Sequence, residues 1–172
     1  ADGTGVYMNT RDGRQVLDLY GGHAVAALGY SHPRLLAALE AQARALIFQS
    51  NAVPLEVRAR AALRLTRFAG LGLNTAFFIS TGAEANENAI KLARMYTGRQ
   101  KIMVRYRSYH GATSGAMTLT GDPRRWAAEP GIPGVIHVLD PYHGLQRGWD
   151  TAAQSLAYLE EVIELEGPKH IA

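Results

Sequence analysis

Residues 76–98 constrain the fold of this chain more than any other stretch. Their sequence is Ala-Phe-Phe-Ile-Ser-Thr-Gly-Ala-Glu-Ala-Asn-Glu-Asn-Ala-Ile-Lys-Leu-Ala-Arg-Met-Tyr-Thr-Gly. The apolar run 76–79 predicts a short strand that is covered on both faces. Thr81 and Glu84 have the spacing of a capping box, which predicts that a helix begins here. We expect the helix to end at Gly98, because glycine readily adopts the left-handed backbone that stops a helix.

The predicted helix carries one apolar stripe. Five residues recur on it at helical spacing, and we expect them to form its buried face: Ala85, Ala89, Leu92, Ala93 and Tyr96. A strand, a tight turn and an amphipathic helix in this order are typical of an α/β layered architecture.

The turn at residues 80–83, Ser-Thr-Gly-Ala, has the composition of an anion site. A helix start leaves backbone N–H groups without partners and carries partial positive charge, and Gly82 lets an anion approach the backbone closely. The natural ligand of such a turn is a phosphate group. An ordinary turn whose polar side chains only cap the helix accounts for the same residues, so both interpretations remain open on this stretch alone.

The rest of the chain alternates short strands with helices. Asp12-Gly13, between the runs 5–10 and 15–19, predicts a β-hairpin. Apolar spacing, Pro33 and Pro54 predict helices over about 33–48 and 54–68, each with a buried apolar face. Further apolar patterns predict strands at 101–106 and 135–138 and one more helix at 152–165. This order favours an α/β fold with a mostly parallel sheet.

A second motif, Ser108-Tyr109-His110-Gly111-Ala112-Thr113, follows the strand predicted at 101–106. Open α/β sheets bind ligands at the carboxyl ends of their strands. Together with residues 80–94 and Tyr96–Arg99, this motif resembles the class III aminotransferases, which are pyridoxal-phosphate enzymes of fold type I. The resemblance runs along the whole chain, with both motifs in the family's order and spacing.

The resemblance implies a fold, a cofactor and site residues. The fold would be a small N-terminal α+β lobe beginning at residues 1–53, followed at 54–172 by a linker helix and the first part of the large cofactor domain. Pyridoxal phosphate would be the cofactor, held by Thr81, Gly82 and Ala83 at the 80–83 turn. Tyr109 would stack on the cofactor ring, beside His110 and Gly111. A loop tyrosine that packs only against the next helix is the alternative.

The resemblance also implies an activity. The full-length protein would transfer an amino group from an amine or amino acid donor to a 2-oxo acid such as pyruvate, by a ping-pong mechanism, as a homodimer. His23 aligns with the stretch that lines the substrate pocket in this family. The acetylornithine and ornithine branch has Arg where this chain has Ala112, which weakens that substrate assignment.

Two groups that the reaction needs are missing from the chain. The family's Schiff-base lysine and the aspartate that keeps the pyridine nitrogen protonated both lie further along the sequence than residue 172. None of the three lysines matches that lysine's position: Lys91, Lys101 and Lys169. We therefore expect the chain to be the first part of a longer enzyme and to be inactive alone. The chain has no initiator Met, which suggests that its first residue is not the true N-terminus.

Other functions are weighed against this one. A non-catalytic phosphate-binding or assembly module would keep the fold without the chemistry, and an aminomutase of the same family would keep both motifs. No G-K-[ST] follows the 80–83 turn, which argues against a nucleotide-binding P-loop. His32, His137 and His143 lack partners at metal-ligand spacing, so no metal site is expected.

Composition excludes several classes of protein. The net charge of +3 comes without a basic run, so no nucleic-acid partner is expected. The sequence has no cysteine, which excludes disulfides and fits a cytoplasmic protein. We find no secretory leader and no long apolar span, so no membrane partner is expected either.

Overall fold

A computed structural model describes residues 2–149 and 151–172 of the chain. The chain divides into two compact units, residues 1–76 and residues 77–172, and each is described on its own. The boundary between a small lobe and a cofactor domain, which the sequence places at 53/54, stays a prediction.

The first unit begins with a small antiparallel sheet of three strands, in the order β1 (Asp2–Thr4), β2 (Tyr7–Asn9) and β3 (Gln15–Leu17). Asn9 pairs with Gln15 across the turn that contains Asp12-Gly13, and Gly13 has a φ of 83° there. This confirms the predicted hairpin. Strand β1, which is only three residues long, was not predicted.

Three helical segments complete the first unit: α1 (Gly21–Ala24), α2 (Pro33–Ala45) and α3 (Glu56–Ala69). Helices α2 and α3 begin and end within a few residues of the predicted limits. Their apolar faces, however, are not buried in this chain, since Leu36 and Leu63 are each about half exposed. The prediction of buried faces is wrong here because periodicity marks a face able to pack, whereas burial needs a neighbouring element to cover it.

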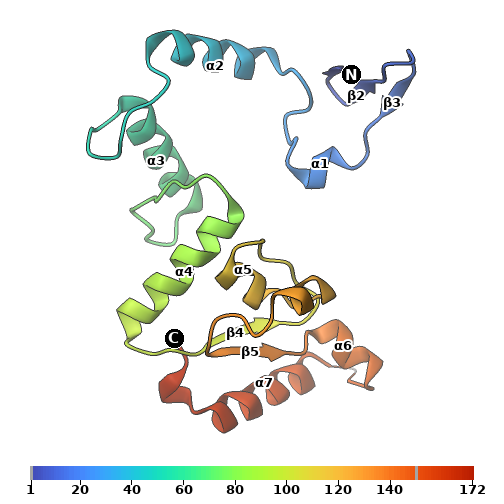
Figure 1. Cartoon of the computed structure of the whole chain (residues 1–172), viewed down its shortest axis with the longest axis vertical. Coiled ribbons are helices and arrows are strands. Elements are labelled where there is room, and N and C mark those ends of the chain that lie inside the picture. Colours follow the sequence, from blue (N-terminus) through green and yellow to red (C-terminus); the bar gives the residue numbers. More distant parts are fainter. Residues whose placement is uncertain (1, 150) are drawn as a thin grey trace. The chain divides into compact units, whose positions relative to one another are not determined.

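The second unit contains a two-stranded parallel sheet, β4 (Ile102–Arg105) with β5 (Val135–Val138), in the register Ile102↔Val135. Figure 1 shows α4 and α5 on one side of these strands and α7 on the other. Both strands were predicted, and their parallel pairing confirms the expected sheet type. The remaining elements of the unit are α4 (Gly82–Thr97), α5 (Ser114–Leu119), η1 (Pro123–Ala128), α6 (Pro141–Gln146), α7 (Ala152–Glu166) and η2 (Pro168–His170).

The strand predicted at residues 76–79 does not form in the described part of the chain. A strand needs the N–H and C=O groups of a neighbouring strand, and no described segment pairs with these residues. Phe77 is 64% exposed, so the expected burial is absent as well. An apolar run identifies a segment that can join a sheet but does not supply its partner.

Helix α4 has both predicted ends but buries a different face from the one expected. Thr81 caps its first turn, and Gly98 ends it with left-handed backbone at φ 70°. Tyr96 and Leu92, on the predicted apolar face, are 94% and 55% exposed. Ile90 is the buried residue, and the half-buried side chains near it include Asn86 and Glu87. The packed face of α4 is therefore largely polar, which a search for apolar spacing cannot detect.

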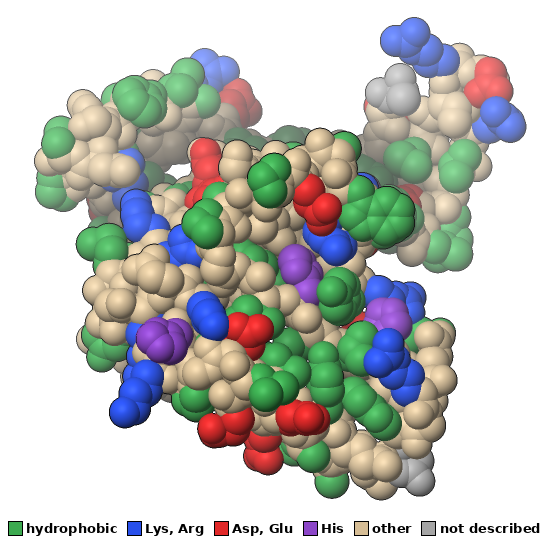
Figure 2. Space-filling view, turned by 60° about the horizontal axis from the view of Figure 1, so that its bottom comes forward, with side chains coloured by type: hydrophobic (Ala, Val, Ile, Leu, Met, Phe, Trp, Pro, Cys, Tyr) green, Lys and Arg blue, Asp and Glu red, His purple; other side chains and the backbone are tan. Residues whose placement is uncertain are grey.

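The well-buried core of the second unit is small. It joins α4, α5 and β5 through Ile90, Ala116, Leu119 and Val138, with the hydroxyl residue Thr120 fully buried among them. Apolar side chains remain visible at the surface between charged ones (Figure 2). Among the described residues, no helix combines the length and the hydropathy that crossing a membrane requires.

We predict that His137 on β5 makes stability depend on pH. Burial lowers the pKa of His137 below its usual value of about 6.5, and its Nε2 lies 3.2 Å from the carbonyl of Thr120. The unfolded chain therefore takes up the proton first, and the stability contributed by neutral His137 is lost as pH falls below about 6.5 toward the folded pKa. Urea denaturation between pH 7.5 and 5 should show this loss. His137→Gln should reduce the slope, and equal slopes in both proteins would contradict the prediction.

Candidate functional site

The 80–83 turn is organised by a capping box. The hydroxyl oxygen of Thr81 accepts the N–H of Glu84 at 3.1 Å, and the Glu84 carboxylate accepts the N–H groups of Ser80 and Thr81 at 2.8 and 3.1 Å. The predicted capping box is therefore confirmed, and it gives the N–H groups of Ser80 and Thr81 an acceptor. Within the described residues, the N–H groups of Gly82 and Ala83 donate no hydrogen bond.

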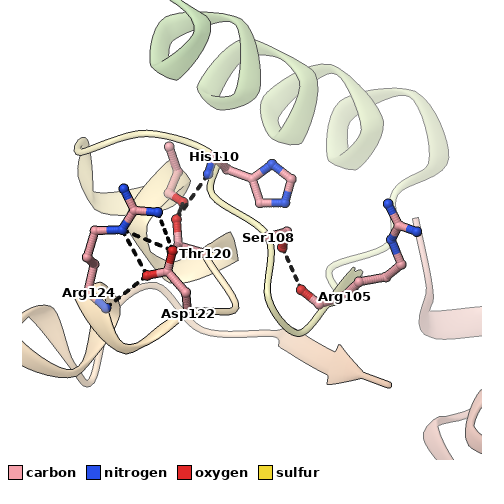
Figure 3. Close-up of polar contacts among 7 residues, drawn as sticks. Arg105, Ser108, His110, Thr120, Asp122 and Arg124 are labelled. Atoms are coloured by element: carbon pink, nitrogen blue, oxygen red, sulfur yellow. Dashed lines mark hydrogen bonds and ion pairs between the residues drawn. The ribbon is translucent and has the colours of Figure 1, made fainter. Parts of the chain in front are cut away.

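The segment Ser108–Gly111, called here the aromatic loop, follows the carboxyl end of β4. The N–H of His110 donates to the hydroxyl of Thr120 at 3.1 Å, as Figure 3 shows, and its carbonyl accepts from Asn86 Nδ2 at 2.7 Å. A Cβ on Gly111 would lie 2.5 Å from the Cβ of Ala83, so only glycine allows this approach. The aromatic loop and the 80–83 turn are therefore in direct contact.

Glu87 joins α4 to the helix that follows the aromatic loop. Its Oε1 accepts the N–H groups of Gly115 and Ala116 at 2.7 and 3.2 Å, at the start of α5. A hydrogen bond from Thr113, followed by those two backbone donors, lowers the pKa of Glu87 despite its partial burial. One face of α4 thus places Ala83 against Gly111, supports the aromatic loop through Asn86 and supports the start of α5 through Glu87.

The residues of this site fit a phosphate ester attached to a flat ring. Two N–H groups at the start of α4 are available, and a Cβ on Gly82 would meet no atom within 4 Å, so the turn is open beside them. Tyr109 is 48% exposed and presents an aromatic face in the loop that touches the turn. An anion at Gly82 and Ala83 and a ring against Tyr109 are compatible with this geometry.

The remaining predicted residues are placed as follows. His23 belongs to the first unit, where its backbone is left-handed at φ 60° and its ring lies 4.9 Å from that of Tyr20. Its role toward a substrate stays a prediction. Lys101 Nζ donates to the carboxylate and the carbonyl of Glu166, both at 2.6 Å, at the end of β4 opposite the aromatic loop. No group of potential metal ligands occurs among the described residues.

Sequence reasoning missed the supporting residues of the site. Asn86, Glu87 and Thr120 were assigned no role, although Asn86 and Glu87 stand three and four positions after Ala83 and so share its face of the helix. That spacing is the signal that could have found them. Thr120 gives no such signal, because it reaches His110 only through the fold of α5.

Comparison with known proteins places the chain in a family. The family described as "Aminotransferase class-III" matches residues 1–172, the whole chain. The chain belongs to the class III aminotransferases. This family uses pyridoxal phosphate, and its solved members have the fold type I architecture that the sequence predicted.

Individual relatives support the assignment. The chain is 40% identical to acetylornithine aminotransferase of Nitrosomonas europaea and 39% identical to that of Gloeobacter violaceus, over 96% of its own length in both cases. Among solved structures, taurine:2-oxoglutarate aminotransferase from Bifidobacterium kashiwanohense, in complex with PLP and glutamate, matches 99% of the chain with a TM-score of 0.94 and 35% identity. An (S)-enantioselective omega-transaminase from Thermomicrobium roseum matches all of it, with a TM-score of 0.92 and 32% identity.

The class III aminotransferase chain is much shorter than these relatives. It spans 43% and 42% of the two acetylornithine aminotransferases, and 40% and 41% of the two solved structures. The activity of a whole enzyme is therefore a proposal for this protein.

We predict that Glu87→Ala destabilises the second unit by about 1–3 kcal/mol, because the N–H groups at the start of α5 lose their acceptor. Urea denaturation at pH 7 measures the change. Glu87→Gln, which keeps one acceptor oxygen, should lose less. Lys91→Gln, at an exposed position of the same helix, should change the free energy of unfolding by no more than about 0.5 kcal/mol. A loss in Glu87→Ala no larger than in the Lys91 control would contradict the capping role.

Proposed function

We propose that this chain is the cofactor-phosphate half of a pyridoxal-phosphate-dependent transaminase. One observation carries the proposal: the free N–H groups of Gly82 and Ala83 lie in a turn that packs directly against the loop of Tyr109. A phosphate site joined to an aromatic face is what a phosphorylated pyridine cofactor requires. The family of the chain, which uses this cofactor, supports the same conclusion.

The chain's own residues would act mainly by binding and orientation. Gly82 and Ala83 would donate N–H groups to the cofactor phosphate, at the positive end of α4. Thr81 would add its hydroxyl hydrogen, since its oxygen already accepts from Glu84. Tyr109 would cover one face of the ring, with His110 and Gly111 keeping the loop against α4 through the Asn86 contact. When bound, pyridoxal phosphate supplies the electron sink for reaction at the amine carbon.

The proposed reaction is amino-group transfer from an amine or amino acid to a 2-oxo acid such as pyruvate, by a ping-pong mechanism. His23 is proposed as a substrate contact. The two relatives reported above are acetylornithine aminotransferases. This chain has Ala112 at the position where that branch of the family has an arginine, so we do not propose acetylornithine as its substrate. Following the family resemblance, we further propose a cytoplasmic homodimer, with residues 1–53 in the small lobe and 54–172 leading into the cofactor domain.

Absorbance spectroscopy of the full-length protein with pyridoxal phosphate tests this function. We expect a visible cofactor band that bleaches when an amine donor is added and returns with pyruvate. The 172-residue chain alone should show no turnover, because the family's Schiff-base lysine has no counterpart among Lys91, Lys101 and Lys169. A folded full-length protein that gives no band would overturn the enzyme proposal in favour of a non-catalytic module. A band that bleaches but does not return with any 2-oxo acid would favour an aminomutase.

A further inference from the structure

Arg124 lies on the face of the tyrosine that is proposed to stack on the cofactor. Its guanidinium carbon is 3.9 Å from the centroid of the Tyr109 ring, within the range of a cation–π contact. Since Tyr109 is 48% exposed, this contact covers one side of the ring and leaves the ring partly open. Nothing in the sequence motif of the aromatic loop indicates this partner, which comes from the start of η1.

Asp122 fixes the guanidinium in that position. Its carboxylate oxygens accept from Arg124 Nε at 3.0 and 2.9 Å and also from Nη2 (Figure 3). The same carboxylate accepts the backbone N–H of Arg124 at 2.9 Å and so caps η1. These bonds from Arg124 lower the pKa of Asp122, which keeps the acid ionised at neutral pH. The arginine is therefore held in place before any ligand binds.

The backbone links this pair to the aromatic loop. The N–H of Gly121 donates to the carbonyl of Ser108 at 2.8 Å, and its carbonyl accepts from Arg107 N–H at 3.1 Å. A Cβ on Gly121 would lie 2.3 Å from the carbonyl oxygen of Arg105, so the two segments approach as closely as glycine permits. These backbone contacts therefore hold the segment of Asp122 and Arg124 against the segment that carries Tyr109.

We propose that Arg124 is a positioning residue for the cofactor ring: held by Asp122, it clamps one face of Tyr109 so that the opposite face receives the ring. The inference rests on the proposed function. A clamped side chain loses less rotamer freedom when the cofactor binds, so the clamp strengthens binding through Tyr109 without contacting the cofactor.

Direct binding of an acidic substrate group by Arg124 is the competing role. The geometry favours the clamp, because Nε and Nη2 already serve Asp122 and the charge of the pair is balanced. Among the described residues Nη1 has no hydrogen-bond partner, whereas Nε and Nη2, the pair of nitrogens that would grip a carboxylate side-on, already donate to Asp122. The two roles predict different effects of an Arg124 substitution on cofactor binding and on KM for acidic donors.

The test uses the full-length protein and measures three quantities: the dissociation constant of pyridoxal phosphate, the circular dichroism of the bound cofactor, and KM for acidic donors. Arg124→Met should raise the dissociation constant about two- to fivefold and change the dichroism, as expected for a lost cation–π contact. Asp122→Asn should act in the same direction, and Arg124→Lys should recover part of the loss. In a Tyr109→Leu background, Arg124→Met should have no further effect, because the clamp acts only through the ring.

Arg44→Met is the matched control. Arg44 is an exposed arginine that pairs with Glu40 through Nε and Nη2, much as Arg124 pairs with Asp122, but it contacts no aromatic ring among the described residues. The Arg44→Met variant should leave all three quantities unchanged. The thermal midpoint of each apo-protein shows whether a variant is folded, and Arg124→Lys carries the test if Arg124→Met does not fold.

The possible outcomes separate a failure of the proposed function from a failure of the Arg124 clamp. A wild-type protein that binds no pyridoxal phosphate overturns the proposed function and the clamp together. A normal wild-type cofactor band with an unchanged dissociation constant and dichroism in Arg124→Met overturns the clamp alone. If KM for acidic donors then rises, Arg124 is a substrate contact. An equal loss of cofactor affinity with and without Tyr109 also contradicts the clamp.

Discussion

The close packing of the aromatic loop on the first turns of α4 is the contact on which the candidate site depends. Gly111 against Ala83 brings Tyr109 to the helix end that carries two free N–H groups. Asn86 then bonds the carbonyl of His110 in the aromatic loop, and Glu87 bonds the start of α5, the helix that follows the loop. A phosphate site or an aromatic loop alone would describe many proteins, whereas their contact supports the proposed site for a phosphorylated ring.

Polar groups do the positioning here that apolar packing does in most cores. Thr120 is fully buried and accepts the N–H of His110, while Asp122 holds Arg124 against Tyr109. Buried or half-buried polar side chains must find partners, and that requirement fixes their geometry more narrowly than apolar contact does. The few well-buried apolar residues, Ile90 and Leu119 among them, lie on α4, α5 and β5 and join these elements.

The sequence predicted the features that are set locally. The capping box at Thr81 and Glu84, the stop at Gly98 and the hairpin all depend on neighbouring residues, and all are confirmed. The strand at 135–138 is confirmed as well, because β4 supplies its distant partner. Other features that depend on distant partners were missed. The apolar run 76–79 lacks a paired strand, and the face of α4 that packs is polar, so neither outcome was visible in hydrophobic spacing. The role of Arg124 depends on a contact across fifteen positions that no motif marks.

The most direct measurement is a crystal structure of the full-length protein with pyridoxal phosphate. We expect phosphate oxygens within hydrogen-bonding distance of the N–H groups of Gly82 and Ala83. The pyridine ring should stack on the face of Tyr109 opposite Arg124. A phosphate bound elsewhere, or a cofactor ring that does not contact Tyr109, would contradict the central claim that the 80–83 turn and the aromatic loop form one cofactor site.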